Sequence, residues 1–123
     1  MLIPTLHFCG DCVSAIALYE KAFKTKASID YKNDNEVRWA EMSIHGQKMY
    51  LNDRHDFSNK NRTLDGTVHL MVVFDTVDEL LACYEDFKDN SRIVNPFGEA
   101  PYCELGGNFI DNFGVLWGFM VFR

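Results

Sequence analysis

An internal repeat constrains the fold of this chain more than any other feature of its sequence. Residues 68–87 read as a buried strand followed by an amphipathic helix, and the same pattern occurs near the N-terminus. At one constant offset, Asp11, Val13, Ile16 and Phe23 recur as Asp75, Val77, Leu80 and Phe87. A repeat of about half the chain indicates two copies of one supersecondary unit. We therefore expect two similar modules within one domain.

Each copy predicts a strand, a helix and three further strands. Asp11 is placed to cap the first helix through its carboxylate, and Asp75 or Thr76 is placed to cap the second. Pro96 and Gly98 favour an irregular loop. The expected strands are residues 2–8, 27–32, 36–45, 47–52, 68–74, 93–94, 103–111 and 115–122, and the expected helices end near residues 24 and 89. The fold class is α+β, with tandem βαβββ modules at residues 1–53 and 67–123 and a polar linker at 54–66.

Composition limits the partners of this chain. The 123 residues suit a single domain, and 47% of them are apolar, so the core needs no metal or disulfide. The net charge is −6, with 12 basic and 18 acidic residues and no Lys/Arg cluster, which argues against nucleic-acid binding. The longest apolar run, residues 113–122, is too short to span a membrane. With no targeting segment at the N-terminus, we expect a cytoplasmic protein.

The cysteines allow two interpretations. Without a secretory signal, reduced thiols are expected. Cys9 and Cys12 form a C-x-x-C motif between a strand and a helix N-terminus, where backbone dipoles lower the pKa of a thiol, and this favours a redox pair. Alternatively, Cys12 belongs to the buried stripe of the helix, and the intervening Gly10 and Asp11 serve only as turn and cap.

Several short strings resemble one known superfamily in their order and spacing. They are Pro4-Thr5-Leu6-His7-Phe8 with Gly10-Asp11-Cys12, Ala40-Glu41 with Leu51-Asn52-Asp53, His69-Leu70-Met71-Val72, and Asp111 with Phe113-Gly114 and Trp117-Gly118. Together they resemble the glyoxalase/bleomycin-resistance/extradiol-dioxygenase superfamily, also called the vicinal oxygen chelate fold, and most closely its PhnB-like branch. The resemblance implies two modules whose sheets curl into halves of a cup, with helices outside. The halves pair within a chain or across a swapped dimer, so a homodimer is expected.

The resemblance also implies a metal site, and the residues at its ligand positions can be compared with those of this chain one by one. Relatives of this kind usually hold a divalent metal with His and Glu side chains from the first and last strands of the modules. His69 stands at one such position, but Gly118 stands where metal-binding relatives carry Glu. In the first module the matching position is Pro4 or Thr5, and the orientation of His7 stays open. Three protein ligands are normally needed, so we expect no cofactor. The alternative is a divalent metal ion held by an atypical set of protein ligands.

The third strand supplies candidate ligand-binding residues. Alternation predicts one face with Val37, Trp39, Glu41 and Ser43 and an opposite face with Arg38, Ala40, Met42 and Ile44. Trp39 and Tyr50 either line the cup or belong to the core or a dimer interface. A desolvated Glu41 would have a raised pKa and could bind a cation or act as a base. It could also be an exposed residue or be paired with an arginine. Phe97, Tyr102 and Asn108 lie on segments expected at the cup.

Three hypotheses follow. The first is a PhnB-like protein that binds a small organic ligand without a family-type catalytic metal, in a site lined by Trp39, Glu41, Tyr50, His69 and Asn108. The second is a divalent-metal-dependent enzyme of the glyoxalase, dioxygenase or resistance type, with ligands drawn from His69, His7, Glu41 and Asp53. The third is a structural dimerisation module. The sequence assigns no catalytic residue and leaves open whether the protein is an enzyme.

Overall fold

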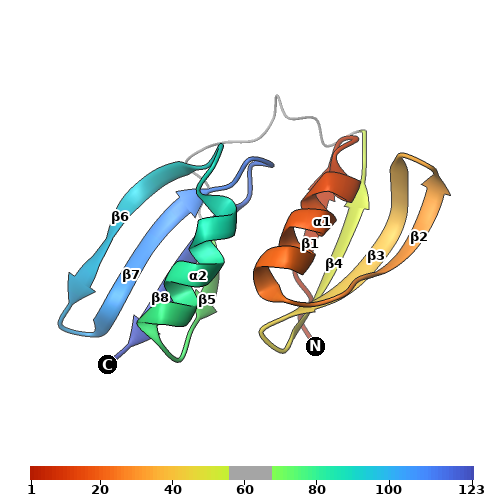
Figure 1. Ribbon diagram of the computed structural model, residues 1–123. Coiled ribbons are helices and arrows are strands. Elements are labelled where there is room, and N and C mark those ends of the chain that lie inside the picture. The colour runs from red at the N-terminus through yellow and green to blue at the C-terminus, as the bar shows by residue number, and fades with distance from the viewer. Residues whose placement is uncertain (56–67) are drawn as a thin grey trace. The chain divides into compact units, whose positions relative to one another are not determined.

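The chain folds into two compact units with the same order of elements. A computed structural model describes residues 1–55 and 68–123. The units are Met1–Arg62 and Thr63–Arg123. Each one runs strand, helix, strand, strand, strand, with the helix lying over one face of a four-stranded sheet (Figure 1). The predicted α+β class with two βαβββ modules is confirmed. The predicted linker falls almost wholly on residues outside the described ranges.

The first unit has strand order β1-β4-β3-β2. Its elements are β1 (Thr5–Phe8), α1 (Cys12–Phe23), β2 (Ser28–Asn33), β3 (Glu36–Ile44) and β4 (Gln47–Asp53). Strand β1 pairs with β4 in parallel, and the other pairs are antiparallel. Because parallel strands need a crossover connection, α1 returns across the sheet and packs on β3 and β4. The core between helix and sheet includes Phe8, Tyr19 and Leu51, all fully buried.

The second unit repeats this arrangement with order β5-β8-β7-β6. Its elements are β5 (Leu70–Val73), α2 (Val77–Phe87), β6 (Arg92–Ala100), β7 (Cys103–Ile110) and β8 (Leu116–Phe122). Its core is a cluster of aromatic rings, in which Phe109 and Phe119 meet edge to face at 4.9 Å. Trp117 is 1% exposed, as predicted for a core residue, and its Nε1–H donates to Asp111 at 2.9 Å.

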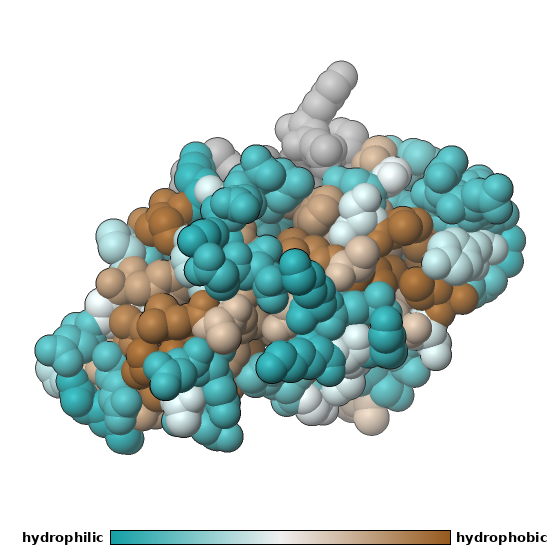
Figure 2. Space-filling view, in the orientation of Figure 1, coloured by the Kyte–Doolittle hydropathy of each residue, from teal (hydrophilic) through white to brown (hydrophobic). Residues whose placement is uncertain are grey.

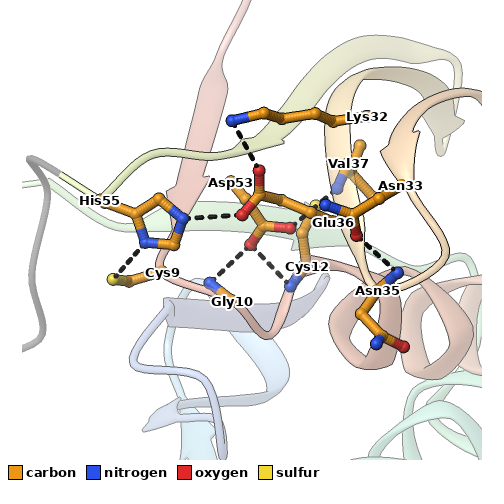
Figure 3. A network of polar contacts seen from close by, with 10 residues as sticks. All are labelled: Cys9, Gly10, Cys12, Lys32, Asn33, Asn35, Glu36, Val37, Asp53 and His55. Carbon is orange, nitrogen blue, oxygen red and sulfur yellow. Dashed lines mark hydrogen bonds and ion pairs between the residues drawn. The ribbon is translucent and has the colours of Figure 1, made fainter.

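The cap of α1 differs from the prediction. Asp11 makes no capping bond among the described residues, and one of its carboxylate oxygens is buried there without a partner. Asp53, at the end of β4, takes over the role. Its Oδ1 accepts from the backbone N–H groups of Gly10 at 2.8 Å and Cys12 at 3.1 Å (Figure 3). In α2, Thr76 is the cap, accepting from the backbone N–H of Glu79 at 3.1 Å.

The alternation predicted for β3 is interrupted by a bulge. Asp30 pairs with Trp39 and the next residue of β2 pairs with Val37, so Arg38 is an extra residue. Val37 and Ala40 are therefore both fully buried, while Trp39 is 40% exposed. The prediction that Val37 shares a face with Trp39 is wrong. Arg38 also turns outward, and its guanidinium pairs with Asp30 at 3.5 Å.

Strand β6 is longer than predicted. A short strand and a loop were expected, but residues 92–100 form one strand with shifted register. The ring of Phe97, in the shifted part of the strand, packs against Tyr84 at 4.8 Å and lies over Gly107. Phe97 therefore packs with the aromatic rings next to α2, and it is not among the residues that line the cavity on the sheet of this unit.

The surface of the protein mixes polar and apolar side chains. Both units show hydrophobic side chains beside hydrophilic ones (Figure 2). The exposed apolar residues include Leu81 on α2 and Met71 and Val73 on β5. Within residues 1–55 and 68–123, no helix is long and apolar enough to cross a membrane.

Candidate functional site

The first unit carries an aromatic and charged surface on the sheet face opposite α1. Trp39 on β3 and Tyr50 on β4 pack with ring centroids 4.6 Å apart. Glu41 lies opposite Tyr50 in the strand register. The Glu41 side chain is 46% exposed and its carboxylate pairs with Lys48 at 3.4 Å, so the expected desolvation is not found in this unit. An open depression of about 330 Å³ borders Trp39, Glu41 and the adjacent strand β2.

His7 lies on the same face, which settles the orientation left open by the sequence. Strand pairing sets His7 opposite Asn52, and Tyr50 and Asn52 point to the face away from the buried Leu51. His7 Nδ1 is 2.6 Å from Asn52 Oδ1. Because the amide oxygen can only accept, Nδ1 carries the hydrogen in this contact.

Asp53 has a structural place in this unit. Besides the two bonds to the start of α1, its Oδ2 accepts from the backbone N–H of Val37 at 2.9 Å. One carboxylate thus joins the β1–α1 turn, the start of β3 and the end of β4. The sequence could not show this role, because the three bonds connect segments far apart along the chain.

The second unit contains a cavity of about 440 Å³ on its sheet. His69 and Asn108 converge there over Gly118. A Cβ atom added to Gly118 would lie 2.9 Å from Asn108 Nδ2 and 3.1 Å from His69 Nε2, so the absence of a side chain lets His69 and Asn108 approach the strand this closely. Met71 and Met120 supply apolar walls. Tyr102 also lines the cavity and is 65% exposed, so it lies at the rim.

A row of strand neighbours organises the cavity. Met71, Gly118, Asn108 and Asn95 lie side by side across strands β5, β8, β7 and β6. Asn95 Nδ2 donates to Asn108 Oδ1 at 2.7 Å, which fixes the amide of Asn108 with its Nδ2 over Gly118. Asn95 was missed by sequence reasoning, because the loop predicted at this point hid its pairing with Asn108.

The donor atoms do not fit a family-type metal site. Three His, Cys, Asp or Glu ligands are normally needed, and the described residues contain no such group. In the second unit, His69 lies beside Asn108 over Gly118, and the carboxylate of Glu99, which also lines the cavity, pairs with Arg123 at 3.2 Å. In the first unit, Asp53 holds three backbone amides. We therefore derive no chemical step through a metal.

The two cysteines of the C-x-x-C motif have different environments. Cys12 is fully buried, and burial raises the pKa of its thiol to about 12, helped by the nearby carboxylates of Asp53 and Asp11. The lowered pKa predicted from the helix N-terminus is wrong for Cys12, since desolvation outweighs the dipole. Its place on the buried helix stripe is confirmed. Cys9 remains partly exposed, and neither cysteine forms a disulfide.

Comparisons with known proteins agree with this architecture. A comparison with curated proteins found no match. A PhnB protein from Bacillus cereus has a similar structure, with a TM-score of 0.83, 23% identity and 98% of each chain covered. A Pseudomonas aeruginosa protein gives a TM-score of 0.84 at 17% identity, covering 98% of this chain and 96% of that one. At these identities the likeness shows the fold alone.

The family itself is shown by the sequence. Residues 3–119 match the Glyoxalase/Bleomycin resistance protein/Dioxygenase superfamily, which is nearly the whole chain. The resemblance found in the short strings is thereby confirmed at the level of the superfamily, and the two βαβββ units have the fold expected for it. This chain belongs to the glyoxalase/bleomycin resistance protein/dioxygenase superfamily.

Proposed function

We propose that this protein binds a small organic ligand on its sheets and needs no family-type catalytic metal to do so. The observation that carries the proposal is the convergence of His69 and Asn108 over Gly118 in the cavity of the second unit. Cavities of this kind, with apolar walls and a few polar atoms, are the usual small-molecule sites.

The cavity favours a ligand with an acceptor group attached to an apolar body. The amide N–H groups of Asn108 and the ring nitrogens of His69 offer hydrogen bonds at its floor. Met71 and Met120 surround them with flexible, polarisable side chains that adapt to different shapes. Antibiotic-like aromatic compounds are one class with this combination, and sequestration of such a compound is one instance of the proposed function.

The first unit offers a second recognition surface. The exposed ring of Trp39 beside Tyr50 suits stacking on a planar group. Glu41 and Lys48 place opposite charges next to these rings. We include Trp39, Glu41 and Tyr50 in the proposed site on this basis. We also propose a homodimer, which sedimentation equilibrium tests directly.

The experiment uses a defined aromatic probe. Anilinonaphthalene sulfonate carries an anionic acceptor on an apolar body, and its fluorescence reports binding. We expect saturable binding to chelator-treated protein and loss of affinity in His69→Ala. The control is Glu104→Gln, an exposed side chain on the same strand as Asn108. A His69→Ala protein that is folded and binds the probe as tightly as wild type would contradict the proposed site.

A metal-dependent enzyme is the alternative, and the exposed imidazole of His69 in the cavity is what favours it. Elemental analysis with and without added Zn, Ni, Mn or Fe separates the two proposals. One ion per chain, lost in His69→Ala, would support the enzyme and overturn the metal-free binding protein.

A further inference from the structure

A cysteine, a histidine and a glutamate form a chain of contacts in the first unit, away from the Trp39 surface. Cys9 Sγ lies 3.6 Å from His55 Nδ1, and His55 Nε2 lies 2.7 Å from Glu36 Oε1 (Figure 3). The order is that of a nucleophile, a base and an orienting carboxylate. We propose that Cys9 is a reactive thiol that small disulfides modify by thiol–disulfide exchange, with His55 as its base.

The hydrogen-bond pattern assigns the tautomer of His55. The carboxylate of Glu36 also pairs with Lys32 at 3.2 Å, so it is an acceptor toward both neighbours. In the neutral imidazole of His55, Nε2 then carries the hydrogen, and the Nδ1 lone pair faces the thiol of Cys9. The His55 contact, followed by that of Lys32, lowers the pKa of Glu36.

Asp53 holds the three segments in place. It bonds the N–H of Gly10, which follows Cys9, and the N–H of Val37, which follows Glu36. His55 itself comes two residues after Asp53 in the chain. The contacts between the side chains are thus supported by backbone bonds beneath them, and such support is what an oriented thiol needs.

The exchange step balances without another reactant. The thiol hydrogen of Cys9 moves to His55 Nδ1, and the thiolate attacks one sulfur of the small disulfide. A new S–S bond forms as the old one breaks, and the leaving thiolate takes the proton from His55. The sulfur of Cys9 is oxidised and the released sulfur is reduced.

Cys12 cannot complete a dithiol cycle in the folded protein. It is fully buried and its thiol keeps its proton, so it does not attack the mixed disulfide on Cys9. The C-x-x-C motif is then a single modification site rather than a dithiol redox centre. This inference does not rest on the proposed ligand site, because every residue in it lies outside that site.

The test reacts the reduced, folded protein with oxidised glutathione at neutral pH and locates the product by peptide mapping. We expect one glutathione per chain, on Cys9, and a rate about tenfold lower in His55→Ala. The rate for Glu36→Gln should lie between those of the wild type and His55→Ala. Glu104→Gln changes an exposed side chain in the second unit and should leave the rate unchanged.

Two results would overturn the inference. One is an equal rate in folded wild type and folded His55→Ala, and the other is glutathione on the buried cysteines as readily as on Cys9. If His55→Ala does not fold, the inference is tested instead by the rate at which iodoacetamide alkylates Cys9 in the wild-type protein. Cys9 should react faster when folded than when unfolded in urea, and an equal or slower folded rate rejects the role of His55.

Discussion

Replacing Asp53 with alanine should destabilise the first unit more than any change at the predicted cap, Asp11. Asp53 accepts three backbone N–H groups, from Gly10, Cys12 and Val37, at 2.8, 3.1 and 2.9 Å. Hydrogen bonds to a charged acceptor contribute about 1.5–3 kcal/mol each where they are buried, and less where water replaces the acceptor. With the Gly10 bond exposed and the others part-buried, we expect a loss of about 4 kcal/mol.

The matched variant is Asp11→Ala. Its carboxylate makes no cap bond within the described residues, so we expect a change within about 0.5 kcal/mol. Urea unfolding measures both free energies, and hydrogen exchange should show lost protection at the amides of Cys12 and Val37 in Asp53→Ala only. The reasoning is refuted if Asp11→Ala costs about 1 kcal/mol or more, as a true N-cap would, while Asp53→Ala costs less.

Two further predictions concern stability. The pKa of the Cys12 thiol is its ordinary 9.0 in the unfolded protein but about 12 in the folded protein. Its contribution to the free energy of unfolding is therefore complete below pH 9 and declines above it. Relative to Cys12→Ala, wild type should lose about 1.4 kcal/mol by pH 10, measured by urea unfolding across pH, and a parallel pH dependence would contradict this. A Cβ on Gly107 would lie 2.8 Å from the Phe97 ring, so Gly107→Ala should cost about 1–3 kcal/mol. Gly98→Ala, with open space around its added Cβ in the described structure, should be nearly neutral by thermal unfolding, and equal costs would count against the packing argument.

The sequence predicted the fold because the repeat is carried by local patterns. The helices α1 and α2 and the strand β4 are set by patterns among neighbours a few residues apart, and these elements lie close to their expected positions. The bulge at Arg38, which interrupts the alternation of β3, was not predicted because a bulge depends on how β3 pairs with β2. The role of Asp53 was missed for a similar reason, since a strand-end aspartate gives no local sign of the turn it will bond.

The candidate site was predicted less completely than the fold. His69 and Asn108 were both expected to line a ligand site, and they converge within one unit. Gly118 was interpreted only as a missing metal ligand, whereas in the structure it lets the side chains of His69 and Asn108 approach each other over the strand. The network of Cys9, His55 and Glu36 had no sequence signal, because Glu36 and His55 come from the start of β3 and the residues after β4.

The most direct test of the account is the affinity of anilinonaphthalene sulfonate for Gly118→Ala, measured by fluorescence titration in the presence of a chelator. A methyl group at this position would press on the side chains of His69 and Asn108 and displace them from their present positions. We predict that the dissociation constant rises about fivefold or more, equivalent to about 1 kcal/mol, while Glu104→Gln binds as wild type does. An unchanged dissociation constant in a folded Gly118→Ala protein would contradict the proposal that ligands bind over Gly118.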